Sequence, residues 1–100
     1  MRVLWGMREV CRIIGNGDAR AGRKLLAKLA DRMTEARIKH PDWAGKGKYW
    51  GLAAVESEMA EFRQAVLSES KERQVSEGLD LITTAVRHIL DEYELTEGYR

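Results

Sequence analysis

Cysteine, proline and long apolar runs are scarce in this chain of 100 residues. The single cysteine, Cys11, cannot form an internal disulfide, and one thiol cannot supply a zinc site built from clustered cysteines. The longest unbroken apolar run covers only residues 52–55, which is far too short to cross a membrane, and no signal peptide is recognisable. These absences predict a soluble, cytoplasmic protein whose thiol stays reduced.

An excess of either charge is also missing from the chain as a whole, since its formal net charge is only +1. The two halves differ, however. Residues 1–48 carry 12 basic and 5 acidic side chains, whereas residues 49–100 carry 5 basic and 11 acidic ones. The total charge therefore excludes no class of partner, and any electrostatic recognition depends on the separate halves. The length predicts one domain, residues 1–100.

Apolar residues recur every three or four positions, which predicts helices. The first expected helix ends near Ile14, and the second runs from Asp18 to about Lys39. The third and fourth cover about 49–67 and 72–93. Gly15-Asn16-Gly17 is a typical helix stop, and Asp18 is the expected N-cap of the second helix. No alternating run is long enough for a strand. The pattern predicts an all-α fold with a four-helix bundle-like protomer.

Acidic residues form two pairs with helical spacing. Glu58 and Glu61 are three residues apart on the third expected helix, and Glu77 and Asp80 are three apart on the fourth. Residues at i and i+3 project from one side of a helix, so antiparallel helices would bring the four carboxylates together. Four oxygen donors in a helical bundle suit a hard divalent cation, most naturally Mg²⁺.

The helical wheel leaves the surroundings of these acids open. Glu77, Asp80 and Thr84 fall opposite the apolar stripe of the fourth helix. They are therefore either ordinary solvated surface charge or covered by a further helix, for which another subunit is one source. The apolar stripes expected on the third and fourth helices comprise Leu52, Val55, Met59, Phe62 and Val66, and Val75, Leu79, Ile82, Val86, Ile89 and Tyr93.

The two acidic pairs also carry a resemblance to a known family. Glu58-Met59-Ala60-Glu61, a 15-residue gap, and Glu77-Gly78-Leu79-Asp80 resemble the ExxE, spacer, ExxD signature of the MazG-like all-α nucleoside triphosphate pyrophosphohydrolases. The resemblance covers residues 50–92. Many members double the first glutamate of each motif, and here serines, Ser57 and Ser76, stand at those positions.

The resemblance implies a Mg²⁺-dependent enzyme that cleaves a nucleoside triphosphate between its α and β phosphates, giving the monophosphate and pyrophosphate. By motif position, Glu58, Glu61, Glu77 and Asp80 would be the metal ligands. Glu58 or Glu61 would also orient or deprotonate the attacking water. The resemblance further implies a homodimer or homotetramer whose second subunit completes the helical bundle. Such metal ions neutralise the polyphosphate and activate water.

Five further residues are candidates for substrate binding. Lys46 and Lys48 precede the first motif and are candidate phosphate partners, with a solvated loop as the alternative. Trp43 is a candidate for stacking on a base or for core packing. Thr84 and Arg87 lie one and two turns beyond Asp80 on the fourth helix. Three other residues have structural expectations: core packing for Trp50, and structural or surface positions for His40 and His88.

The second helix is basic through five arginines and lysines, which raises a nucleic-acid hypothesis. Their side chains spread over the whole polar side, without interleaved aromatics, so we expect a solvated face and no nucleic-acid partner. Two alternatives to the preferred function stay open: a non-catalytic helical binding or assembly module, and a phosphoribosyl-ATP pyrophosphohydrolase. The basic residues are Arg20, Arg23, Lys24, Lys28 and Arg32.

Overall fold

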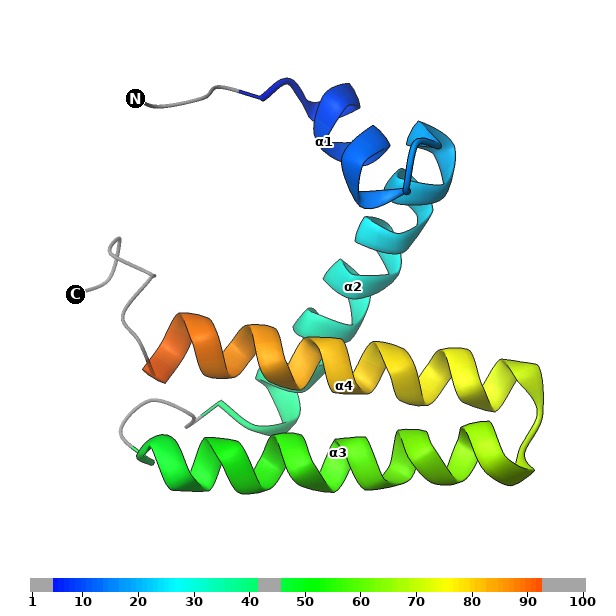
Figure 1. Ribbon diagram of the computed structural model, residues 1–100. Coiled ribbons are helices and arrows are strands. Elements are labelled where there is room, and N and C mark those ends of the chain that lie inside the picture. Colours follow the sequence, from blue (N-terminus) through cyan, green and yellow to red (C-terminus); the bar gives the residue numbers. More distant parts are fainter. Residues whose placement is uncertain (1–4, 42–45, 93–100) are drawn as a thin grey trace. The chain divides into compact units, whose positions relative to one another are not determined.

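The computed structural model describes residues 5–41 and 46–92. These residues form four helices and contain no strand, so the all-α prediction is confirmed. None of these helices combines the length and apolarity needed to span a bilayer. The chain divides into two compact units, Met1–Asp31 and Arg32–Arg100. The helices, labelled in Figure 1, are α1 (Met7–Ile14), α2 (Ala19–Lys39), α3 (Lys48–Ser68) and α4 (Lys71–Glu92).

The turn between α1 and α2 has the predicted chemistry. Asn16 and Gly17 adopt the left-handed backbone conformation, with φ of 57° and 98°. The Gly17 amide donates to the Arg12 carbonyl oxygen over 2.8 Å, which closes the C-terminus of α1. Asp18 is the N-cap of α2, since its Oδ1 accepts from the Arg20 and Ala21 amides over 2.9 and 3.1 Å.

Glycine allows α1 and α2 to approach closely inside the first unit. A Cβ atom at Gly22 would lie 1.7 Å from the Cys11 carbonyl oxygen, so no larger residue fits without backbone movement. Cys11 is 1% exposed, so this thiol is buried. The smallest side chain thus sets the distance between the two helices at this point.

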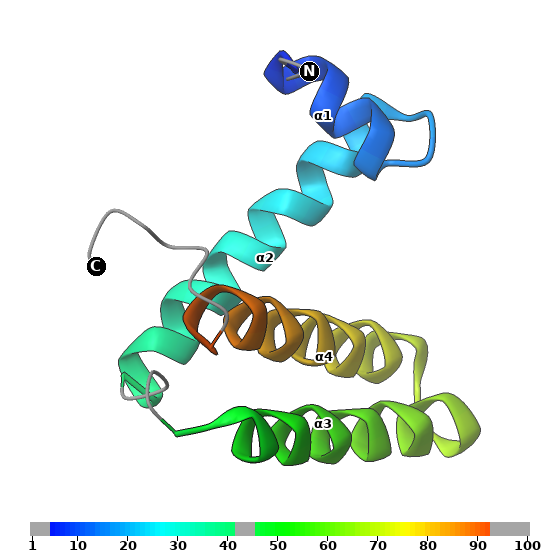
Figure 2. The same ribbon diagram turned by 60° about the vertical axis from the view of Figure 1, so that its left-hand side comes forward.

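In the second unit α3 and α4 form an antiparallel hairpin, which both views show (Figures 1 and 2). Only Glu69 and Ser70 separate the two helices. The Ser70 hydroxyl accepts from the Arg73 amide over 3.2 Å and so caps the start of α4. At the far end of the hairpin, a Cβ atom at Gly51 would lie 1.9 Å from His88 Nδ1. The hairpin therefore brings the two acidic pairs of the sequence onto neighbouring helices.

The apolar stripes of the hairpin divide between an inner and an outer face. Leu79 is buried, and Val55, Phe62 and Val86 are partly buried. Tyr93 lies outside the described residues. The remaining members are 39% to 51% exposed and recur every seventh residue on each helix, so the expectation that each whole stripe is buried is wrong for one protomer. This outer apolar face consists of Leu52, Met59 and Val66 on α3 and Val75, Ile82 and Ile89 on α4.

The C-terminus of α2 is bound to α4 by a buried arginine. Arg87 is only 2% exposed, and its Nη1 and Nη2 donate to the carbonyl oxygens of Ala36 and His40 over 3.0 and 2.6 Å. The last carbonyls of a helix lack partners within the helix, and a cation there also complements the helix dipole. Arg87 therefore holds the end of α2 beside the acidic side of α4.

Candidate metal centre

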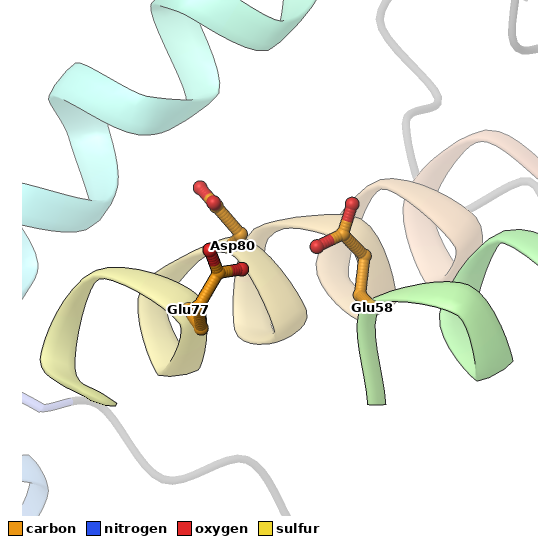
Figure 3. A group of neighbouring side chains, drawn as sticks. All are labelled: Glu58, Glu77 and Asp80. Carbon is orange, nitrogen blue, oxygen red and sulfur yellow. The ribbon is translucent and has the colours of Figure 1, made fainter. Parts of the chain in front are cut away.

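Three carboxylates meet between α3 and α4. Glu58 comes from α3, and Glu77 and Asp80 come from successive turns of α4 (Figure 3). One carboxylate oxygen from each lies within 4.8 Å of the others. Each pair lies on one side of its helix because a spacing of three residues is nearly one helical turn. The antiparallel hairpin then places a residue of the first pair beside both members of the second.

Two of these carboxylates have oxygens without a hydrogen-bond partner. Glu77 is 5% exposed; one of its oxygens accepts from Arg73, whereas Oε2 is buried and has no partner in the described part of the chain. Glu58 Oε2 is buried in the same way. Buried carboxylate oxygens without donors are costly, and a bound cation would satisfy them. The arrangement therefore fits a metal ion chemically as well as geometrically.

The electrostatics of the cluster appear in the pKa of Glu58, which is raised from its ordinary value of 4.5 to about 7. Burial is the largest cause, followed by the charge of Glu61 and a hydrogen bond with it, and then by the charges of Asp80 and Glu77. Removing water and adding like charges both disfavour the carboxylate form. Glu58 therefore exchanges a proton close to neutral pH.

This raised pKa predicts a pH dependence of the metal-free protein. Between about pH 4.5 and 7 the folded chain keeps a proton on Glu58 that the unfolded chain releases, so stability falls as the pH rises through this window. In thermal unfolding with a chelator, we expect Glu58→Gln to raise Tm relative to the unsubstituted protein at pH 8 and to change it less at pH 5.5. An equal Tm difference at both pH values would contradict this account.

Arg32 reaches the cluster from α2 and contacts it at Asp80. Its guanidinium forms an ion pair with Asp80, donates to the Ser76 carbonyl oxygen over 3.1 Å, and donates to the Ser76 hydroxyl over 3.0 Å. Asp80, whose side chain is 39% exposed, is therefore bound by a helix of the same chain, which answers for this residue the question that the helical wheel left open. For Arg32 itself, the expectation of a solvated face is wrong, since its side chain is 26% exposed and bound to α4.

A cavity of about 200 Å³ lies beside the carboxylates. Glu58 and Asp80 line one part of it, and Arg32 and Lys39 from the second half of α2 line another. Thr83, which is 4% exposed, also lines it, and its Oγ1 is a buried hydroxyl oxygen with no hydrogen-bond partner within the described ranges. The cavity therefore presents carboxylates, positively charged side chains and an unpaired hydroxyl, which together suit a ligand that carries both positive and negative charges.

Glu61, the remaining member of the first acidic pair, is not one of the three carboxylates whose oxygens converge. It is exposed and lines a separate cavity of about 340 Å³ together with Glu77 and Arg73. Glu61 is linked to the three converging carboxylates through Glu58, with which it shares a hydrogen bond and whose pKa its charge raises. Glu61 therefore influences Glu58, although its own carboxylate is not part of the convergent group.

The predicted substrate-binding residues have different locations. Thr84 lines the 200 Å³ cavity and also an adjoining cavity of about 220 Å³. Lys46 and Lys48 are exposed, with their Nζ atoms 5.5 Å from the Trp50 ring centre and 5.1 Å from the Tyr49 ring centre. Trp43 lies outside the described residues. Trp50, expected in the core, is 41% exposed and lines the adjoining cavity, so that expectation is wrong.

Arg87 has a structural position instead of the expected one in a phosphate-binding cleft. Phosphate recognition needs guanidinium donors that face the ligand, whereas Nη1 and Nη2 of Arg87 donate to backbone carbonyl oxygens of α2 and its end. The side chain is also buried, with Asp91 Oδ2 3.8 Å from its Nε. Its position seven residues beyond Asp80 did not reveal this, because that spacing gives nearly the same side of α4 but says nothing about the α2 carbonyl oxygens that take its donors.

Sequence reasoning missed six residues that line the cavity: Arg32, Glu35, Ala36, Lys39, His40 and Thr83. Arg32 and Lys39 belong to the basic half of the sequence, and the acids belong to the acidic half. The opposite charges of the two halves were therefore an available signal for this juxtaposition. No pattern pointed to Thr83, since threonine on an amphipathic helix is ordinary.

Known proteins supply no further identification at this point. Comparisons with models of protein families, with curated proteins and with solved structures found no match. The function is therefore inferred from the chemistry of the carboxylate cluster and its surroundings.

Proposed function

We propose that the protein is a Mg²⁺-dependent nucleoside triphosphate pyrophosphohydrolase that converts an NTP or dNTP to the monophosphate and pyrophosphate. One observation carries the proposal: carboxylate oxygens of Glu58, Glu77 and Asp80 lie within 4.8 Å of one another, at the spacing of the ExxE and ExxD motifs. The same residues on unrelated surfaces of the helices would not support it.

The donor set suits Mg²⁺. All three candidate ligands are carboxylates, and Mg²⁺ typically takes a few carboxylates and completes its shell with water and substrate phosphates. Oε2 of Glu58 and Oε2 of Glu77 are buried oxygens that a cation would satisfy. When bound, the ion neutralises the polyphosphate and lowers the pKa of a water molecule. Glu61 lies beside this ligand set, where it interacts with Glu58.

Glu58 also fits the role of proton acceptor for the attacking water. Its pKa is raised to about 7 in the metal-free protein, and a bound cation would lower it and so favour the carboxylate form that a proton acceptor needs. Glu61 supports this role because its charge is one cause of the raised pKa. In the proposal, Glu58 therefore combines ligand and base functions, and Glu61 tunes it.

The adjoining cavity is a place for the nucleoside. It is lined by Trp50, Ala54 and Ser57. It shares Glu58, Thr84 and His40 with the cavity of about 200 Å³, which we call the charged cavity. An exposed indole ring can stack on any base, and the two small side chains leave room beside it. The candidate phosphate partners are Lys46, Lys48, Arg32 and Lys39.

A homodimer or homotetramer belongs to the proposal because of the outer apolar face of the hairpin. Its residues recur every seventh position on α3 and on α4, the spacing of helices that pack against a partner helix. Exposed apolar stripes of this extent are characteristic of association surfaces. A second hairpin packed on this face would complete a four-helix bundle.

One observation favours the second candidate, a non-catalytic helical module. Asp80 is paired with Arg32, and Glu77 is paired with Arg73. Such pairs would neutralise the acids if no metal ever bound, and the hairpin would then serve only as a scaffold. The two candidates differ in one respect that can be measured, which is cleavage of nucleotides.

The decisive experiment incubates the protein with a panel of NTPs, dNTPs and phosphoribosyl-ATP in the presence of Mg²⁺, with detection of pyrophosphate. Release from at least one nucleotide, and its loss with chelator, is the expected result. The control protein is Glu56→Gln, which changes an exposed glutamate on the same helix as Glu58 and should retain the activity. No release from any nucleotide would refute the enzymatic proposal and favour the module.

A further inference from the structure

The charged cavity has basic and acidic linings that face a common space. Glu58 and Asp80 line it from the hairpin, and two basic side chains, Arg32 and Lys39, line it from α2 together with one acid, Glu35. A free cation would meet the carboxylates but also the positive side chains, and a free phosphate would meet the reverse. A cation already bound to a phosphate chain complements both linings at once, because the cation and the phosphate oxygens carry opposite charges.

The interaction of Arg32 with Asp80 is more than a surface ion pair. Its guanidinium binds the Asp80 carboxylate, the Ser76 carbonyl oxygen at 3.1 Å and the Ser76 hydroxyl at 3.0 Å, and its side chain is only 26% exposed. Charge-assisted hydrogen bonds of this kind are stronger than neutral ones. Any cation that uses Asp80 as a ligand must therefore compete with Arg32.

The cavity contains a second, independent sign of a ligand. Thr83 is 4% exposed, and its Oγ1 is a buried hydroxyl oxygen without a hydrogen-bond partner in the described part of the chain. It lines the same cavity as Arg32 and Asp80. A hydroxyl donates well to phosphate oxygens. The cavity thus holds a donor that a bound phosphate would satisfy, beside the acids that a cation would satisfy.

From this arrangement we infer that Arg32 is a positioning residue that makes cation and phosphate binding depend on each other. Without phosphate, Arg32 neutralises Asp80 and weakens the binding of a free divalent cation. When a cation arrives on a phosphate chain, Arg32 transfers its hydrogen bonds to phosphate oxygens and releases Asp80 to the cation. The inference rests on the proposed metal site and specifies its ligand as a metal–polyphosphate complex.

The test measures two affinities, for Mn²⁺ alone and for preformed Mn²⁺–tripolyphosphate, by the loss of the free Mn²⁺ electron paramagnetic resonance signal and by calorimetry. In Arg32→Gln, Mn²⁺ alone should bind roughly tenfold more tightly, because a competing positive charge is removed. Mn²⁺–tripolyphosphate should bind roughly tenfold more weakly, because its phosphates lose a partner. Arg37→Gln, which removes an exposed charge on the same helix, is the matched control and should change neither affinity more than about twofold.

Ser76→Ala provides a variant that leaves Arg32 in place. It deletes the hydroxyl acceptor, so Arg32 holds Asp80 less firmly, and Mn²⁺ alone should bind more tightly while Mn²⁺–tripolyphosphate binding is kept. If Arg32→Gln does not fold, this variant decides: an unchanged affinity for Mn²⁺ alone overturns the inference. Opposite shifts of the two affinities in Arg32→Gln support it.

The outcomes separate this inference from the proposed function. If Asp80→Asn binds Mn²⁺ as well as the unsubstituted protein, the metal site itself is refuted, and the inference falls with it. If Mn²⁺ binding depends on Asp80 but does not tighten in Arg32→Gln, the role of Arg32 alone is overturned and the metal site stands.

Discussion

Replacing Asp80 by asparagine is expected to lower Mg²⁺-dependent pyrophosphate release by roughly 10²- to 10³-fold, because a metal clamp on a polyphosphate contributes several kcal/mol to transition-state stabilisation. Asparagine keeps the shape and one oxygen but removes the charge that holds a cation. Glu77→Gln should have a similar effect, since Glu77 is nearly buried and supplies an oxygen without another partner. The measurement is kcat/KM for the best nucleotide of the panel.

Two controls define this result. Glu56→Gln changes an exposed glutamate two residues before Glu58 and should leave kcat/KM within about twofold. Asp80→Asn should also lose the Mg²⁺-induced rise in Tm, since a cation that binds only the folded state stabilises it by mass action. Retained activity together with a retained Mg²⁺ effect on Tm would show that Asp80 is not a ligand.

The helices and their ends could be predicted because their causes are local. The apolar spacing indicated four helices, and the structure begins or ends α2, α3 and α4 within a few residues of the expected positions. Asp18 was predicted as an N-cap from its residue type and place, and its carboxylate accepts the two amides that such a cap requires. The left-handed turn at Asn16 and Gly17 has the same local origin.

The acidic motifs could be predicted for the same reason, but their neighbours could not. The spacing of three residues placed Glu77 and Asp80 on one side of a helix. The residue that binds Asp80, Arg32, is 48 positions away from it along the chain, and helical periodicity says nothing about which helix lies opposite. Periodicity also failed to divide the apolar stripes, because an inner face and an outer face of a hairpin share the same heptad spacing.

Arg87→Ala is expected to reduce the free energy of unfolding by about 3 kcal/mol, the largest stability effect of any substitution considered for this chain. Two charge-assisted hydrogen bonds to the end of α2 disappear, and the buried carboxylate of Asp91 loses the guanidinium 3.8 Å away. For a chain of this size, Tm should fall by more than about 10 °C. Thermal and urea unfolding followed by circular dichroism measure both quantities.

The same substitution connects the end of α2 to the cavity. Lys39 and His40 line the cavity, and the His40 carbonyl oxygen is one of the two that Arg87 binds. Arg87→Ala should therefore loosen this wall and weaken Mn²⁺–tripolyphosphate binding even below its Tm.

Arg63→Ala, an exposed arginine on α3, should change the unfolding free energy by no more than about 0.5 kcal/mol and leave binding intact. Arg87→Lys should lie between the two, because an ammonium keeps the charge but cannot reach both carbonyls in the fixed geometry of a guanidinium. Equal stability of Arg87→Ala and Arg63→Ala would mean that the end of α2 is held by other contacts.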